Sequence, residues 1–96
     1  MKLDQEAAQA LAIQALAFVA SDPDLLPRFL SITGIEADTI RLAAREPGFL
    51  AGVLQFVANH EPTLLLFAES AGIKPQTVMD AMRALPLGSE DYDRSV

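Results

Sequence analysis

Residues 16–45 of this chain match residues 54–83 without a gap, at a constant offset that takes Leu16 to Leu54 and Arg45 to Arg83. Of the 30 aligned positions, 11 carry the same residue in both copies, and most of these are apolar or turn-forming. They are Leu16, Phe18, Val19, Ala20, Leu26, Phe29, Gly34, Ile35, Thr39, Ala43 and Arg45, each of which recurs at the equivalent position of the second copy. Such a match predicts one supersecondary unit used twice. Because apolar and turn-forming residues build a fold rather than an active site, the duplication constrains the architecture and assigns no chemistry.

Each copy contains three helix-like segments separated by glycine and proline. We therefore expect an all-α, compact bundle of about six helices, built as two tandem three-helix repeats with no sheet. The two halves join around Pro47 and Gly48. From Pro86 onward the apolar period is lost and charges accumulate, so residues 86–96 are predicted to be a disordered acidic tail. Residues 1–85 then form a single helical domain.

Acidic residues followed by proline predict where helices begin. Asp22 and Pro23 are a start signal, because an aspartate caps free backbone amides and a proline fits the first helical turn. We expect Glu61 and Pro62 to begin the fifth helix in the same way. Pro75 fits the first position of the sixth helix.

Glycines at equivalent positions predict where helices end. Gly34 and Gly72 follow the second and fifth helices, and we expect both to adopt the left-handed conformation that caps a helix C-terminus. Ile35 and Ile73 follow directly and are placed to pack across the start of the next helix. Both copies are therefore predicted to turn the same corner.

The long helices differ in how their apolar residues are distributed. The first, predicted over residues 3–20, is apolar on every side from Leu11 onward, which is typical of a central helix. The fourth, predicted over residues 48–59, gathers its large apolar side chains on one broad face. Ala51 and Gly52 are expected on the other face, where small residues let another helix approach closely.

The composition excludes several classes of partner. The chain has a net charge of −6 and a pI of about 4.5, so it is repelled by phosphate backbones and by anionic lipid. We therefore expect it to bind neither nucleic acid nor a membrane surface. No uncharged run reaches the roughly 18 residues that a membrane span requires. The chain has no cysteine, so it offers neither a disulfide nor a thiolate metal site, and we expect a cytoplasmic protein.

Residues for catalysis are scarce. His60 is the lone histidine, and no second imidazole or thiol completes a metal or nucleophile site. We expect His60 to be a polar cap or surface residue, and we expect no enzyme activity, no metal and no cofactor. Tyr92, the lone tyrosine, falls in the predicted tail.

Residues 67–85 resemble a DNA-binding helix-turn-helix, which is the alternative functional reading. The resemblance rests on the spacing of Ala68, Gly72, Ile73 and Val78, which specifies a tight corner between two helices. A protein that recognises DNA bases through this motif also needs basic or amide side chains on the exposed face of its second helix. That face carries Gln76, Met79, Asp80 and Arg83, with an aspartate in the middle, which disfavours DNA.

The positions at which the two repeats differ predict an interaction surface. Identical pairs mark the core, whereas Leu42 and Met79 are apolar residues at diverging positions, expected to lie off the packing faces. Three arginines accompany them on the third helices. The candidate surface is Arg41, Leu42, Arg45, Met79 and Arg83. We therefore expect a protein–protein interaction or regulatory adaptor module whose partner the sequence does not identify.

The oligomeric state stays open between monomer and homodimer. Surplus apolar surface on so small a chain favours self-association, because a second copy would cover it. The duplication favours a monomer, because two fused copies cover each other's apolar faces within one chain.

Two long segments carry a family resemblance. DPDLLPRFLSITGI at 22–35 and FLAGVLQFVANHEPTLLLFAESAGI at 49–73, together with the length and the acidic tail, resemble a family of small alphaproteobacterial proteins of unknown function. The resemblance covers most of the chain. It implies a compact, cytoplasmic helical protein with no assigned activity or ligand.

Overall fold

In the computed structural model, which describes residues 4–46 and 48–85, every regular element is helical. The expected all-α class, with six α-helices in the described ranges, is confirmed. A single 3-10 turn, η1, precedes the third α-helix. The elements are α1 (Gln5–Ala20), α2 (Leu25–Thr33), η1 (Ala37–Thr39), α3 (Ile40–Ala43), α4 (Phe49–Ala58), α5 (Glu61–Ala71) and α6 (Pro75–Ala84). Pro47 and the predicted tail at 86–96 lie outside the described residues.

Gly34 and Gly72 end α2 and α5 as the sequence predicts, whereas α2 begins at Leu25, so that Pro23, expected in its first turn, lies before the helix. The Asp22 carboxylate accepts hydrogen bonds from the backbone N–H groups of Asp24, at 2.8 Å, and Leu25, at 3.0 Å. These bonds satisfy amides that have no partner within the first helical turn. Gly34 and Gly72 follow α2 and α5 with φ angles of 77° and 71°, so both are left-handed caps.

The start of α5 differs from the expectation. Glu61 is the first residue of the helix rather than its cap, and His60 stands before it in extended conformation. The reason is the register of the repeat, because His60 rather than Glu61 is the counterpart of Asp22. Pro75 is the first residue of α6, as predicted.

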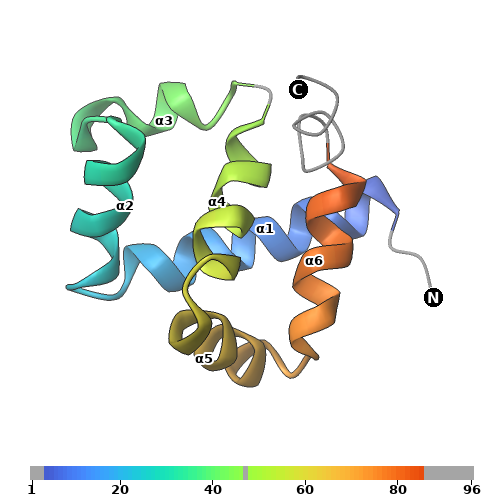
Figure 1. Ribbon diagram of the computed structural model, residues 1–96. Helices are drawn as coiled ribbons and strands as arrows, with labels where there is room; N and C mark the ends of the chain where they lie inside the picture. Colours follow the sequence, from blue (N-terminus) through green and yellow to red (C-terminus); the bar gives the residue numbers. More distant parts are fainter. Residues whose placement is uncertain (1–3, 47, 86–96) are drawn as a thin grey trace, which may run out of the picture.

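Helix α1 forms one layer of the molecule, and the other long helices lie against one side of it. Figure 1 shows α4 and α6 running across α1, and both pack against it and against each other. The face of α1 toward them is made mostly of alanine, whose small side chain lets helices approach closely. Its buried residues are Ala8, Leu11, Ala12, Ala15 and Val19.

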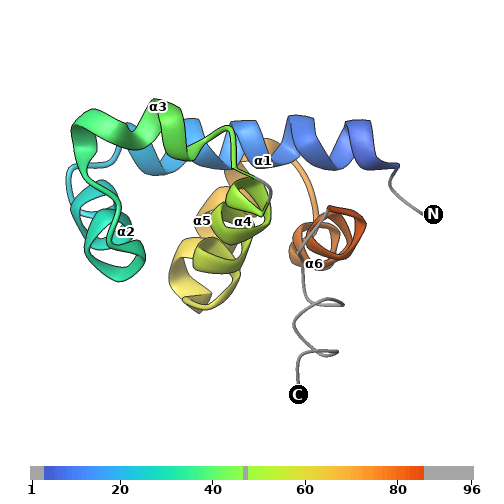
Figure 2. The ribbon, with the colours of Figure 1, turned by 90° about the horizontal axis from the view of Figure 1, so that it is seen from above.

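The opposite side of α1 is open. Figure 2 shows α1 along one edge of the molecule, although it contacts α2, α4, α5 and α6. Ile13, on this open side, is 57% exposed. The expected central helix therefore contacts four others, but these neighbours cover only one of its sides.

The small-residue face of α4 is packed as expected, whereas the third helix is shorter than expected. Ala51 is buried, because α4 packs against both α1 and α6. The α3 helix has four residues, so Arg45 lies beyond its end. Pro47 disfavours a helical conformation in the residue before it, which limits how far α3 can extend.

Backbone hydrogen bonds recur with the sequence repeat. The turns that follow α1 and α4, the starts of α2 and α5, and the corners after the two glycines use corresponding donors and acceptors in the two copies. The matched bonds are Asp22 N–H to Val19 O (3.2 Å) with His60 to Val57 (3.4 Å), Leu26 to Asp22 (3.3 Å) with Leu64 to His60 (2.9 Å), and Thr39 to Glu36 (2.9 Å) with Thr77 to Lys74 (2.9 Å). The two copies therefore share these backbone hydrogen bonds, although the bonds at the glycine caps differ, with Gly34 N–H donating to Leu30 O and Gly72 N–H to Glu69 O.

The aromatic side chains connect the two copies reciprocally. Phe29 of α2 packs edge-on against Phe56 of α4, with ring centroids 5.3 Å apart. The equivalent residues, Phe67 of α5 and Phe18 of α1, lie 5.4 Å apart. The second helix of each half therefore packs on the first helix of the other half, as in a two-fold symmetric dimer where each contact occurs twice.

The third helices depart from this symmetry. Helix α6 packs extensively on α1 and α4, whereas the shorter α3 makes no comparably extensive contact with either. Superposition of the two halves as whole units stays a prediction.

Replacing glycine by alanine should have opposite effects on stability at the end of a helix and inside one. Gly34→Ala and Gly72→Ala should each lower the free energy of unfolding by about 1 kcal/mol, because a Cβ is strained at positive φ. No heavy atom lies within 4 Å of the place a Cβ would occupy at Gly34, Gly72 or Gly52, so the backbone alone decides the sign. Gly52, inside α4, is the matched control, and Gly52→Ala should raise stability by roughly 0.5–1 kcal/mol. Urea denaturation measures all three, and a stabilised Gly34→Ala would contradict the cap assignment.

Candidate functional site

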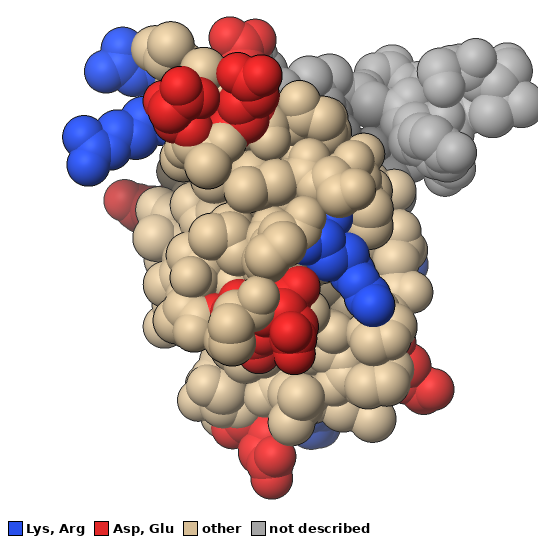
Figure 3. Space-filling model, turned by 90° about the vertical axis from the view of Figure 1, so that its left-hand side faces the viewer, with Lys and Arg blue, Asp and Glu red and all other residues tan. Residues whose placement is uncertain are grey.

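A groove runs between α2 and α4 and encloses about 490 Å³. Its wall is largely apolar: the Phe56 ring packs against the buried Phe29, and Ile32 stands at the edge with 69% of its surface exposed. Figure 3 shows the side of the molecule that carries α2 and α3, where charges of both signs are scattered over a largely uncharged surface. The residues that line this α2–α4 groove are Arg28, Ile32, Thr33, Gly52, Gln55, Phe56, Asn59 and His60.

Gly52 opens the α2–α4 groove from the side of α4. It lies within the helix, and no atom comes within 4 Å of its absent Cβ. Glycine inside a helix lowers stability by roughly 0.5–1 kcal/mol relative to alanine. A larger side chain at this position would extend into space that the groove now leaves open.

A second groove, between α1 and α5, is the counterpart of the first. It encloses about 340 Å³, and nearly all its lining residues are the repeat counterparts of residues in the α2–α4 groove or of its adjoining Phe29. The equivalent pairs are Gln14 with Gly52, Ala17 with Gln55, Phe18 with Phe56, Ser21 with Asn59, Ser70 with Ile32, and Ala71 with Thr33. The two grooves therefore lie at equivalent places in the two halves, and each has phenylalanine in its wall.

The edges of the two grooves differ in charge. Arg28 and His60 stand at the α2–α4 groove, and their counterparts in the repeat are Leu66 and Asp22. Within residues 4–46 and 48–85, the Arg28 guanidinium forms no salt bridge. The α2–α4 groove thus pairs an apolar wall with a cationic edge, which suits an apolar group accompanied by a carboxylate.

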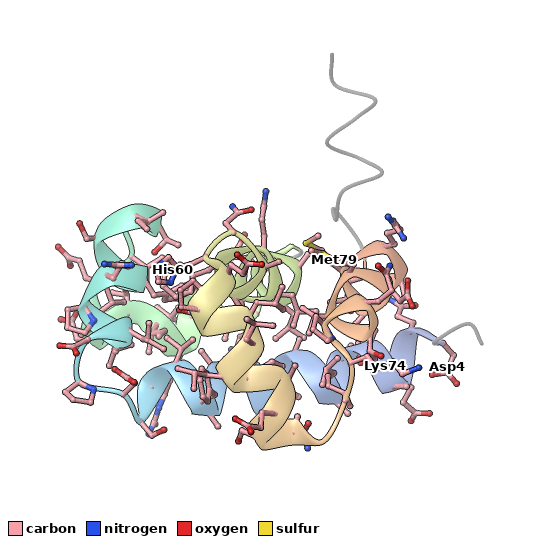
Figure 4. All side chains as sticks on the ribbon, turned by 60° about the horizontal axis from the view of Figure 1, so that its bottom comes forward. Asp4, His60, Lys74 and Met79 are labelled. Atoms are coloured by element: carbon pink, nitrogen blue, oxygen red, sulfur yellow. The ribbon has the colours of Figure 1, made fainter. Side chains whose placement is uncertain are left out.

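His60 is placed by its neighbours as a surface residue. Figure 4 shows it between α2 and the start of α5. Its Nδ1 atom lies 2.7 Å from the Thr63 hydroxyl oxygen, in a hydrogen bond whose direction depends on the tautomer. Thr63 is only 4% exposed, so its hydroxyl is shielded from a substrate and is better suited to packing than to nucleophilic attack.

The surface predicted from the diverging positions is not one surface. Leu42 is 64% exposed, as expected, and Arg41 and Arg45 are exposed beside it. Met79 instead packs against the core and is half-buried. Figure 1 shows α3 and α6 on opposite sides of α4, which separates the α3 arginines from Arg83.

The grooves were not found from the sequence. Their aromatic walls belong to the identical pairs, which indicated core, while their edges fall at positions where the copies diverge. The sequence differences that indicated these edges are Arg28 against Leu66 within the repeat and Gly52 against Gln14 two residues before it. These positions form the edges of grooves only because α2 faces α4 and α5 faces α1, which is a property of the tertiary structure.

The exposed face of α6 is internally paired. The Gln76 side-chain amide donates to the Asp80 carboxylate at 3.2 Å, and Arg83 forms a salt bridge with the same carboxylate at 3.5 Å. In a helix-turn-helix these are the groups that would contact bases. The Asp80 carboxylate binds both the Gln76 amide and the Arg83 guanidinium, and it adds a negative charge between these two side chains.

The described residues contain neither a cluster suited to a metal ion nor a helix suited to crossing a membrane. Across 4–46 and 48–85, no group of three or more His, Cys, Asp or Glu residues is arranged to hold a metal ion. None of the helices in those ranges is long and apolar enough to span a bilayer.

Residues 5–88 match DUF3572, a family of proteins of unknown function. The chain belongs to this family. Membership in DUF3572 confirms the resemblance to an uncharacterised family, while its alphaproteobacterial origin stays a prediction. No curated protein and no solved structure is significantly similar to this DUF3572 chain.

A pair of substitutions tests the His60–Thr63 hydrogen bond. His60→Phe keeps a ring over Thr63 but removes the bonding nitrogen, so it should lower the free energy of unfolding by about 1–3 kcal/mol. Adding Thr63→Val, which removes the stranded hydroxyl, should recover most of that loss. Urea melts of the single and double variants measure the coupling, and additive losses would contradict it.

The pairing within α6 predicts weak DNA binding. Fluorescein-labelled random duplex at low salt should show no polarisation change below a protein concentration of about 100 μM, which is weaker than ordinary non-specific binding. A rise at low micromolar concentration that disappears with added salt would restore the helix-turn-helix reading.

Proposed function

We propose that this chain is a small protein-interaction module with a regulatory adaptor role, and that it holds apolar side chains of a protein partner in the α2–α4 groove. The observation that carries the proposal is the exposed apolar edge of this groove. Ile32 is 69% exposed next to the Phe56 wall, and covering such a side chain contributes about 1.5–3 kcal/mol. A partner side chain entering the groove would cover both residues at once.

The shape of the groove supports a protein partner. It lies along two helices, with Gly52 leaving room on α4 and Arg28 at the edge of α2. This is the form in which an apolar helix face is bound by a groove. The polar groups at the edge fix orientation, while the apolar wall supplies most of the affinity.

The proposal assigns no reaction to the chain. The bond between His60 and the buried Thr63 gives the imidazole a structural partner, which supports a packing role for both. The cysteine-free sequence supports a cytoplasmic setting for the module. DNA binding is the less favoured reading, because Asp80 pairs with Gln76 and Arg83 on α6.

Site-specific photo-crosslinking in cells that express the protein natively tests the proposal. Gln55 is exposed on α4 and lines the groove, so a benzoylphenylalanine placed there should give a protein adduct of defined mass. Gly52→Leu, which fills the groove, should abolish the adduct, and Gly52→Ala, which does not, should retain it. A crosslinker at Ala10, exposed on α1, is the positional control.

Two results would refute the proposal. One is the absence of a protein adduct at Gln55, and the other is an adduct that persists in a folded Gly52→Leu variant. Circular dichroism melts of each variant establish that the fold is intact before the adducts are compared.

A further inference from the structure

Two unassigned surfaces of the molecule have matching chemistry. One is the α2–α4 groove, with its apolar wall and its edge residues Arg28 and His60. The other is the outward side of α5, where Leu65 is 51% exposed and Leu66 is 59% exposed. Both surfaces are apolar at the centre, and burying them together would remove exposed hydrocarbon from water.

Carboxylates flank Leu65, one of the two exposed leucines of α5. Glu61, Leu65 and Glu69 follow one another at four-residue spacing, so they lie along one side of the helix. All three are exposed. This α5 face therefore presents an apolar stripe between two negative charges, which complements an apolar groove with a cationic edge.

The two surfaces are neighbours on the chain. His60 lines the groove and is also the residue immediately before α5. Figure 4 shows His60 at the start of α5, on the side toward α2. When a groove and its complement lie side by side, two copies related by a half-turn can each place one surface in the other, and the contact closes after two subunits.

We infer that the partner of the α2–α4 groove is the α5 face of a second copy of this chain, in a two-fold symmetric homodimer. This inference rests on the proposed function, because it names the occupant of the same groove. In the dimer, Leu66 and Leu65 of each copy face Ile32 and Phe56 of the other. Glu61 and Glu69 then lie toward Arg28 across the interface.

The mass of the full chain in solution tests the inference. Sedimentation velocity over a micromolar concentration series should show a species of twice 10.3 kDa. Leu66→Glu should weaken dimerisation by about tenfold or more, because it places a carboxylate against an apolar wall. Leu42→Glu is the matched control, with the same charge change at a residue 64% exposed on α3, and it should leave the dimer intact.

A charge exchange identifies the contact between copies. Arg28→Glu alone should weaken the dimer, since it places a carboxylate near Glu61 and Glu69 of the other copy. The double variant Arg28→Glu with Glu69→Arg restores opposite charges and the original net charge, so it should recover dimerisation. All substituted residues are exposed, and a circular dichroism melt establishes that each variant is folded.

The outcomes separate this inference from the proposed function. A 10.3 kDa species at every concentration overturns the homodimer, as does a dimer that withstands Leu66→Glu or gains nothing from the charge exchange. A monomer that still forms a Gln55 adduct with a different protein, lost in Gly52→Leu, overturns the homodimer alone. A monomer without any adduct overturns both.

Discussion

The reciprocal packing of two phenylalanine pairs joins the halves of this molecule. Phe29 on α2 packs against Phe56 on α4, and Phe67 on α5 packs against Phe18 on α1. Because each pair joins the second helix of one half to the first helix of the other, neither half completes its packing alone. Truncating a buried phenylalanine costs about 3–5 kcal/mol, a large part of the roughly 5–15 kcal/mol that stabilises a small domain. One pair of rings forms a wall of each groove, so the stability of the fold and the shape of the candidate site depend on the same contacts.

The departure from symmetry gives the two halves different roles. A proline at position 47 limits α3 in the first half, whereas the corresponding helix of the second half, α6, runs for ten residues and packs on α1 and α4. The second half therefore supplies more of the core. The first half keeps more apolar surface in contact with solvent, including Ile32 on α2 and Leu42 on α3.

The two grooves show how a duplicated fold can diverge without losing its framework. The aromatic residues of the two walls are identical in the two halves, while several residues at the edges differ. Gly52 and Arg28 make the α2–α4 groove open and cationic, whereas Gln14 and Leu66 occupy the equivalent positions in the other half. The two grooves therefore differ in a few edge side chains while their aromatic residues are the same.

The sequence by itself determined the all-α class and several helix ends, because those depend on chemistry within a few residues. Asp22 caps α2, Gly34 and Gly72 end helices at positive φ, and Pro75 starts α6, whatever the distant packing is. The tertiary structure decided which apolar residues are covered. Met79 is half-buried and Ala51 is buried while one side of α1 is open, and both grooves follow from which helices face one another. Helical periodicity shows that a side is apolar, but burial depends on contacts between residues far apart in the chain, which no local pattern records.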